Sequence, residues 1–242
     1  MCIRDSYRPE VHDSDGLSIQ SGTGEWIWRP LVNPKRLLVT SYSLSNPSGF
    51  GLMQRDEKQS SYEDLESRYE ARPSAWVEPS GKWGSGRVEL VQIPTPDEYN
   101  DNIVAYWVPD VIPKPGTAIN LDYRLYWNKS AQQRPPLSWV TQTRRGHGHL
   151  RKPDDSTALF VDFEGPIFKK LPSNAKVEFR ASSDSNGEIL EAHTYRNEAS
   201  GGWRAALRIK RVDDKKPIEL RGFLHTNNTT LSETWSYILP AD

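Results

Sequence analysis

The sequence has a single cysteine, Cys2, among its 242 residues, and no strong excess of either charge. An internal disulfide is therefore excluded. No apolar run approaches the roughly 18 residues that a membrane-spanning helix requires. The net charge is −1, with 26% charged residues. A nucleic acid or an anionic membrane surface, each of which attracts basic proteins, is accordingly not an expected partner.

The apolar fraction is also low, at 36%, but nine Trp and ten Tyr offset it. Aromatic residues favour strands, and exposed rings stack on the C–H faces of sugars. The 18 Pro and 16 Gly indicate many turns. This length suits one large all-β domain or two smaller ones, either of which can bury a core.

Short segments rich in β-branched and aromatic residues, bounded by Gly, Pro or Asn, predict strands in the first half. RVELVQI carries apolar groups on both faces, which predicts a strand between two layers. A helix is expected at 60–72, where Tyr62, Leu65, Glu66 and Tyr69 share helical spacing and Arg72-Pro73 ends the pattern. The expected strands are 24–31, 36–44, 86–94, 102–109 and 118–127.

The amino-acid composition changes after YRLYW. Residues 128–137, NKSAQQRPPL, are polar and proline-rich, and we place a linker at 129–137. Seven short strand candidates follow at intervals of about a dozen residues, which is typical of an immunoglobulin-like sandwich over 138–242. Antibody-type cysteines are absent, so strand number alone carries this prediction. The candidates are 138–145, 158–165, 176–183, 188–197, 202–211, 217–226 and 232–240.

One ionisable cluster lies near the start, where Glu10, Asp13 and Asp15 bracket His12 in EVHDSDG. A calcium loop of the EF-hand type needs a third acidic position and a Glu six residues after the glycine, and neither is present. A zinc site needs convergent His and Cys, but the only close histidine pair, in RRGHGHL at 147 and 149, is better explained as a solvated turn. No metal site is predicted.

A second acidic stretch, PTPDEYNDNIVAYW, places Asp97, Glu98 and Asp101 in a loop that runs into an aromatic strand. An apolar wall raises a carboxyl pKa and keeps such a group protonated as an acid. Glycoside cleavage needs such an acid and a second carboxylate that helps to activate water. Solvated loop acids and turn-capping aspartates remain the alternative explanation for each position.

Aromatic and polar side chains in the middle of the first half are candidates for binding sugar. Trp76 and Trp83 lie in a segment rich in Pro and Gly, where a ring more readily faces a groove. Hydroxyl groups of a ligand would find polar partners in the adjacent segment. These polar candidates are Arg55, Asp56, Tyr62 and Glu66.

The segments RPEVHDSDGL, GEWIWRPLVNPKRL, NPSGFGLMQRD, the long run from YEDLESRYEARP to NDNIVAYWVP, YRLYW and LSETWSYILP resemble the periplasmic glucan biosynthesis protein G and D family of Gram-negative bacteria. The resemblance covers 7–242. It implies the C-terminal part of a large mutarotase-like β-sandwich at 7–128, then the immunoglobulin-like domain. Residues 1–6, MCIRDS, are expected to be foreign, with an N-terminal portion missing. The lack of a signal peptide would then say nothing about export, and the resemblance implies the periplasm.

The resemblance also implies a role in osmoregulated periplasmic glucans, which have a β-1,2-linked glucose backbone, with no cofactor. Some members are similar to inverting endo-β-1,2-glucanases. On that basis Asp101 matches the general acid and Asp13 the base side, with Asp97 and Asp15 as the second choices. The rival hypothesis is a non-catalytic glucan-binding or scaffolding factor that assists a membrane glucosyltransferase. The oligomeric state is not predicted.

Overall fold

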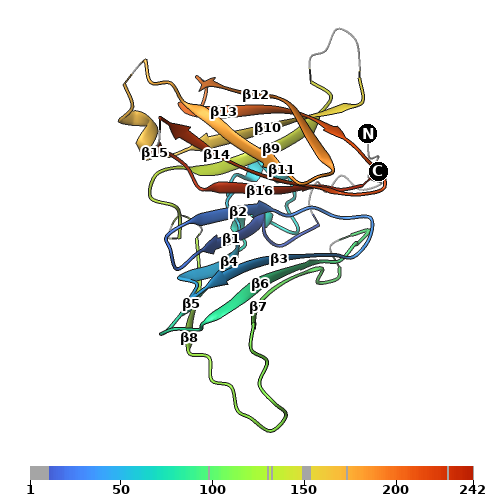
Figure 1. Ribbon diagram of the computed structural model, residues 1–242, viewed down its shortest axis with the longest axis vertical. Helices are drawn as coiled ribbons and strands as arrows, with labels where there is room; N and C mark the ends of the chain where they lie inside the picture. The colour runs from blue at the N-terminus through green and yellow to red at the C-terminus, as the bar shows by residue number, and fades with distance from the viewer. Residues whose placement is uncertain are drawn as a thin grey trace. The chain divides into compact units, whose positions relative to one another are not determined.

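The computed structural model describes residues 11–97, 99–129, 131, 133–148, 154–172, 174–227 and 229–241. Strands dominate, and the helices are single turns, so the predicted all-β class is confirmed (Figure 1). The chain divides into two compact units. Unit 1 takes Leu31–Gln133 and the chain up to Glu25, and unit 2 takes Trp26–Pro30 and Arg134–Asp242. The division after Gln133 lies within the segment that the sequence suggests as a linker.

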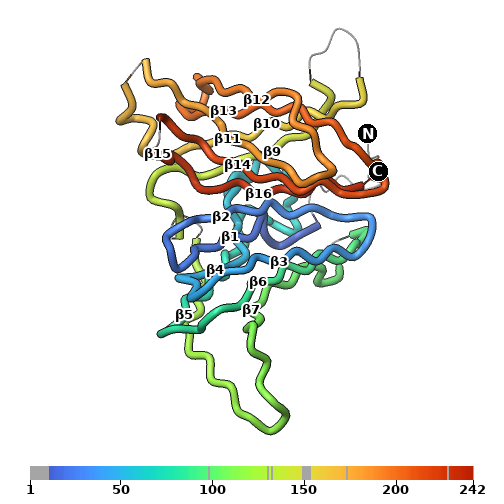
Figure 2. Tube along the Cα trace, in the orientation of Figure 1, coloured from blue at the N-terminus to red at the C-terminus, as the bar shows by residue number. Residues whose placement is uncertain are grey.

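Unit 1 contains two antiparallel sheets, which Figure 2 traces in blue and green. One has the order β1-β4-β5-β8 and the other β3-β6-β7. Their buried side chains include Leu17, Ile19, Phe50, Val88 and Leu90. The strands are β1 (Gly16–Gln20), β3 (Leu38–Ser45), β4 (Gly49–Met53), β5 (Ser74–Pro79), β6 (Ser85–Gln92), β7 (Ile103–Pro109) and β8 (Tyr123–Asn128).

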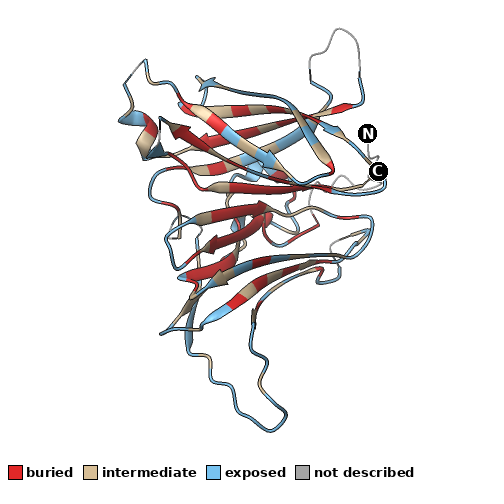
Figure 3. Ribbon diagram, viewed as in Figure 1, coloured by how far each residue is buried: buried red, intermediate tan, exposed pale blue. Residues whose placement is uncertain are grey.

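Strand β6 has one buried face, not the two that the sequence predicts. Val88, Leu90 and Gln92 are buried (Figure 3). On the other face the Arg87 guanidinium pairs with Glu89 at 2.6 Å, and the Tyr106 hydroxyl donates to the same carboxylate at 2.7 Å. The prediction was wrong because no second layer among the described residues buries that face. Long polar side chains that pair with one another cover it instead.

The helix predicted at 60–72 is wrong as a single element. Only α1 (Gln59–Tyr62) and the 3₁₀ turn η1 (Tyr69–Ala71) form. Glu63 and Arg68 adopt left-handed backbone conformations, with φ of 54° and 49°. Between them the Asp64 carboxylate accepts hydrogen bonds from the backbone N–H groups of the two residues that lie two and three positions later. Such local bonds compete with a helix, and here they replace it.

In unit 1 the sequence analysis missed three strands, β1, β4 and β5. Glycine obscured β4, because PSGFGLM looks like a turn. The structure explains both glycines in it: a Cβ on Gly49 would lie 2.2 Å from a ring atom of Trp76, and one on Gly51 would lie 2.1 Å from the Ala75 carbonyl oxygen. Glycine is used here for close approach to β5, not for a turn.

Unit 2 is a sandwich of two sheets. One has the order β12-β13-β10-β9, and the other β11-β14-β16-β2, with β15 paired to β14. The Trp235 indole donates to Thr143 at 3.0 Å, and the rings of Phe163 and Phe179 lie 6.0 Å apart, which joins the sheets. The elements are β2 (Trp26–Pro30), β9 (Trp139–Gly146), β10 (Ser156–Glu164), η3 (Pro166–Lys169), β11 (Glu178–Ser183), β12 (Gly187–Asn197), β13 (Gly202–Arg211), β14 (Ile218–Thr226), β15 (Thr229–Thr230) and β16 (Thr234–Leu239).

All seven predicted strands of the second half are present within a few residues of their predicted ends. Strand β2 is the unexpected member. It pairs in parallel with β16, with Trp28 opposite Trp235, although it lies more than 100 residues before the rest of unit 2. The likenesses to a mutarotase-like and an immunoglobulin-like fold stay predictions.

Candidate active site

Two loops that lie 90 residues apart in the sequence are joined in unit 1. The Nδ1 atom of His12 lies 3.2 Å from the side-chain oxygen of Asn102. The Asn102 amide in turn donates to the Val11 carbonyl at 3.0 Å. Both side chains are buried, so the bonds are shielded from water. The neighbours of this pair in the sequence are Asp13 and Asp101, which are the two predicted catalytic residues.

Asp13 is on the surface, with 65% of its side chain exposed. Its carboxylate pairs with the Arg72 guanidinium at 2.8 Å. Arg72 lies over the ring of the buried Tyr69, at 5.2 Å from the ring centre. The arginine is thus held on an aromatic surface. The Asp13 carboxylate is therefore both reachable by a ligand and held in place by a cation.

Asp15, two residues later, has a different environment. One carboxylate oxygen accepts hydrogen bonds from the backbone N–H groups of Arg55 and Asp56, at 2.5 and 2.6 Å, and the other accepts from the Tyr62 hydroxyl at 2.9 Å. Three donors on one carboxylate make a strong charge-assisted anchor. Asp15 therefore fastens the turn after β4 to the start of β1.

In the acidic loop before β7 the two candidate aspartates also differ in exposure. Asp101 is exposed. Asp97 is half-buried, and its carboxylate accepts a bond from the Tyr99 N–H at 3.1 Å, which closes a local turn. Glu98 lies outside the described residues. The loop rejoins the sheet where the Ile93 N–H donates to the Asn102 carbonyl at 2.8 Å.

The two predicted sugar-binding tryptophans lie in different settings. Trp76 is in the core, with 3% exposed, and its ring covers Gly49. Trp83 is half-buried and is surrounded by aromatic rings, with ring centres 5.9 Å from Trp107 and 6.2 Å from Tyr123. Its indole N–H donates to the Asp122 carbonyl at 3.1 Å. Part of the Trp83 side chain is thus accessible to a ligand, whereas the Trp76 side chain is packed inside the core.

The predicted polar contacts are also dispersed. Tyr62 is buried, and its hydroxyl accepts a bond from the Gln54 amide at 2.7 Å besides donating to Asp15. Arg55 is half-buried beside the same carboxylate. Glu66 is exposed on the segment between α1 and η1. Tyr62 and Arg55 therefore gather at Asp15, and Glu66 does not.

Within the described ranges, no group of three or more His, Cys, Asp or Glu side chains has the arrangement to hold a metal ion. No helix among these residues is long and apolar enough to cross a membrane. His147 is exposed at the end of β9. The predictions for Glu10, for His149 and for the foreign segment 1–6 lie outside the part of the chain that the structure describes.

Sequence reasoning missed the residues that organise these loops. The sequence indicates no more for Arg72 than a helix end, and no more for His12 and Asn102 than that they lie next to acidic residues. No local pattern marks an arginine that will pair with an aspartate 59 positions earlier. The one available signal was the HDSDG and NDN combination, whose buried His12 and Asn102 join the two segments.

Comparison with known proteins identifies the family. The family model described as "Periplasmic glucan biosynthesis protein, MdoG" matches residues 3–239. "Glucans biosynthesis protein G" of Ralstonia nicotianae is 65% identical over 240 residues, which is 97% of this chain and 48% of that protein. The proteins of the same name from Pseudomonas aeruginosa and Serratia proteamaculans are 52% and 51% identical, over 98% of this chain and 47% of their own lengths.

The chain therefore spans about half the length of the curated relatives that it matches. The matched region includes both joined loops and all of unit 2 except its last three residues. With the family model matching nearly every residue, the chain belongs to the MdoG family of periplasmic glucan biosynthesis proteins.

Proposed function

We propose that this chain is part of a periplasmic protein that processes β-1,2-glucan as an inverting endo-glucanase. The family description and the names of the relatives support periplasmic glucan biosynthesis as the setting. The observation that carries the catalytic proposal is the buried contact between His12 and Asn102. It brings together two loops that each carry an exposed aspartate.

In this proposal Asp101 is the general acid and Asp13 acts on the base side. An inverting enzyme protonates the leaving oxygen with one carboxylic acid, while a second carboxylate activates a water from the opposite face of the sugar. The two carboxyl groups then stand roughly 6.5–9.5 Å apart, and a relay through intervening groups would allow more. Arg72 fixes the orientation of Asp13 through their ion pair.

The geometry supports Asp13 and Asp101 over Asp15 and Asp97. A general base must reach a water and accept its proton. Asp15 already accepts three hydrogen bonds within unit 1, and Asp97 accepts one that closes its own turn. Asp13 and Asp101 are both exposed.

The test uses a chimera in which this chain replaces the matching half of the Ralstonia relative. We expect it to release short oligosaccharides from linear β-1,2-glucan with inversion at the new reducing end. Asp101→Asn should lower kcat by roughly 10²–10⁴-fold, because a positioned general acid contributes about that much. Asp97→Asn is the matched control and should keep most of the activity. Wild-type turnover in Asp101→Asn would exclude Asp101 as the acid.

The rival function is a non-catalytic glucan-binding factor that assists a membrane glucosyltransferase. The names of the relatives, which refer to biosynthesis rather than to hydrolysis, favour this second candidate. The same chimera separates the two functions. Binding of β-1,2-glucan with no product after prolonged incubation, in a chimera shown to be folded, would favour the rival and reject the hydrolase.

A further inference from the structure

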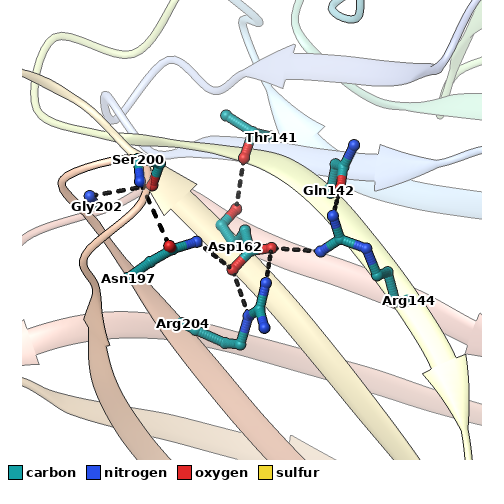
Figure 4. Close-up of polar contacts among 8 residues, drawn as sticks. All are labelled: Thr141, Gln142, Arg144, Asp162, Asn197, Ser200, Gly202 and Arg204. Carbon is teal, nitrogen blue, oxygen red and sulfur yellow. Dashed lines mark hydrogen bonds and ion pairs between the residues drawn. The ribbon is translucent and has the colours of Figure 1, made fainter. Parts of the chain in front are cut away.

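A second surface suited to a ligand lies on unit 2, on the outward face of the sheet β12-β13-β10-β9. Asp162 of β10 is its fixed point, with 5% exposed. Arg204 of β13 donates to both oxygens of this carboxylate, at 2.6 and 2.8 Å, and Arg144 of β9 donates at 2.5 Å. Asn197 donates to it as well, at 3.3 Å (Figure 4). The polar groups are thus held in place before any ligand arrives.

A second ion-pair network lies on the same face around Arg208, four residues along β13 from Arg204. Arg208 pairs with Glu191 of β12 at 2.7 Å and with Asp154, and Ser156 completes the group. Arg208 is opposite Ala158 in the β10–β13 register, as Arg204 is opposite Asp162. Directly opposite residues share a face of a sheet, so the two networks lie on one surface.

Between the networks runs a row of less polar side chains. Phe160 of β10 is two residues from Asp162 and lies on the same face, opposite Ala206 of β13. His193 of β12 continues the row. Tyr195 of β12, which is 45% exposed, lies beside Arg204. The face thus alternates ordered polar groups with an aromatic and apolar strip.

The charges of the two networks cancel. Arg144 and Arg204 share Asp162, while Arg208 is balanced by Glu191 and Asp154. Together the two networks contain three arginines and three carboxylates, so they offer no net positive charge to attract phosphate, nucleic acid or anionic lipid. It does keep many fixed donors and acceptors beside aromatic rings. That is the chemistry that recognises a neutral polyhydroxyl chain, whose hydroxyls pair with planar polar groups and whose C–H faces stack on rings.

We propose that this face of unit 2, from Tyr195 across Arg204 and Phe160 to Arg144, with the buried Asp162 holding both arginines, binds a neutral glucan chain at a site that includes neither Asp13 nor Asp101. The choice of β-1,2-glucan as the ligand rests on the proposed function. Since the donors and acceptors are already ordered, binding loses little side-chain entropy. The site would hold the polymer while another region of the protein acts on it.

The test measures binding of linear β-1,2-glucan to the 242-residue chain by calorimetry, in an Asp101→Asn background that prevents cleavage. Tyr195→Thr keeps a strand-compatible residue and should weaken binding roughly fivefold, which is the usual loss for one aromatic contact. Arg144→Gln, at a half-exposed guanidinium, should weaken it as well. Val212→Thr, at an exposed residue in the turn after β13, is the control and should bind like the parent.

Loss of affinity in Tyr195→Thr and Arg144→Gln, with unchanged melting temperatures, would support the site. Unchanged affinity in both variants would overturn it, and so would preferential binding of an anionic polysaccharide such as polygalacturonate. If the parent chain binds no β-1,2-glucan, this inference fails. The proposed hydrolase stands or falls separately, on product release from the chimera.

Discussion

At the scale of single residues, two aspartates two positions apart have opposite environments. Asp13 is exposed and pairs with one arginine, whereas Asp15 accepts three hydrogen bonds from Arg55, Asp56 and Tyr62. Nothing in the sequence HDSDG distinguishes the environment of one aspartate from that of the other. The difference arises because only Asp15 faces the turn after β4, which supplies two backbone N–H groups.

This contrast predicts different effects on stability. Asp15→Asn should lower the free energy of unfolding by about 2 kcal/mol, because it replaces a charged acceptor with a neutral amide that cannot accept all three bonds. Asp13→Asn should change it by less than about 1 kcal/mol, as exposed ion pairs contribute little. Urea unfolding followed by tryptophan fluorescence measures both. Equal losses in the two variants would contradict the structural role of Asp15.

Asp162 gives a prediction about pH. Burial raises the pKa of this carboxyl, but the hydrogen bonds and charges of Arg204 and Arg144 outweigh that effect and hold its pKa below the ordinary 3.8. A carboxyl with a lowered folded pKa stabilises the fold above its unfolded pKa, and that contribution is lost as the pH falls through the folded pKa.

Asp162→Asn should therefore cost about 2 kcal/mol at pH 7, and the difference from the parent should shrink as the pH falls below about 3.8. Denaturant unfolding at a series of pH values between neutral and acidic measures the effect. A difference that stays constant down to the lowest pH would show that the carboxylate charge is not the source of the stabilisation.

At the scale of elements, alternation of residue types predicted most strands correctly, whereas helical spacing predicted one helix where two separate turns form. Strands β9 to β14 and β16 follow their predicted segments closely, because alternation is a local consequence of strand geometry. The predicted helix failed because Asp64 forms local bonds and because Tyr62 and Tyr69 are both buried, with ring centres 5.7 Å apart. Their spacing of seven fits a helix as well as it fits this turn.

Close packing of strands β4 and β5 gives a prediction for Gly49. Gly49→Ala would place a methyl group 2.2 Å from the Trp76 ring, so the ring must shift. We expect a loss of about 1–3 kcal/mol, the usual cost of overpacking. Gly146→Ala, also at the end of a strand, meets nothing within 4 Å and should be neutral. Thermal unfolding compares the two, and equal melting temperatures would refute the close contact.

At the scale of the whole molecule, the chain does not pass through its two units in simple order. Trp26–Pro30 belongs to unit 2, although the residues before and after it belong to unit 1. Arg29 holds the segment there. It is fully buried and donates to Glu219 through both terminal nitrogens, at 2.8 and 3.0 Å, and to Ser236 at 3.2 Å. Paired donors on one carboxylate give strong, oriented binding.

Cutting the chain between Gln133 and Arg134 should therefore leave the fragments associated. A protease site inserted there, once cleaved, should give two fragments that elute together on size exclusion, because β2 stays paired with β16 and Arg29 with Glu219. In the cleaved protein, Glu219→Ala should release the fragments at lower urea, since it leaves the buried guanidinium without its carboxylate.

Glu178→Ala is the control for this experiment. Its carboxylate pairs with Lys176 on the surface, so the urea concentration for release should be unchanged. Separation of the cleaved parent in plain buffer would contradict the assignment of Trp26–Pro30 to unit 2.

The sequence by itself determined the all-β class, most of the strands and the two acidic loops, because alternation, turn residues and acidic clusters are local patterns. Family membership followed from the order of its motifs. Only the tertiary structure decided that His12 and Asn102 join the loops, that Asp15 is an anchor, and that Trp76 lies in the core. It also decided the place of β2. Each of these depends on contacts between residues far apart in the sequence, where burial and pairing, not local propensity, set the energy.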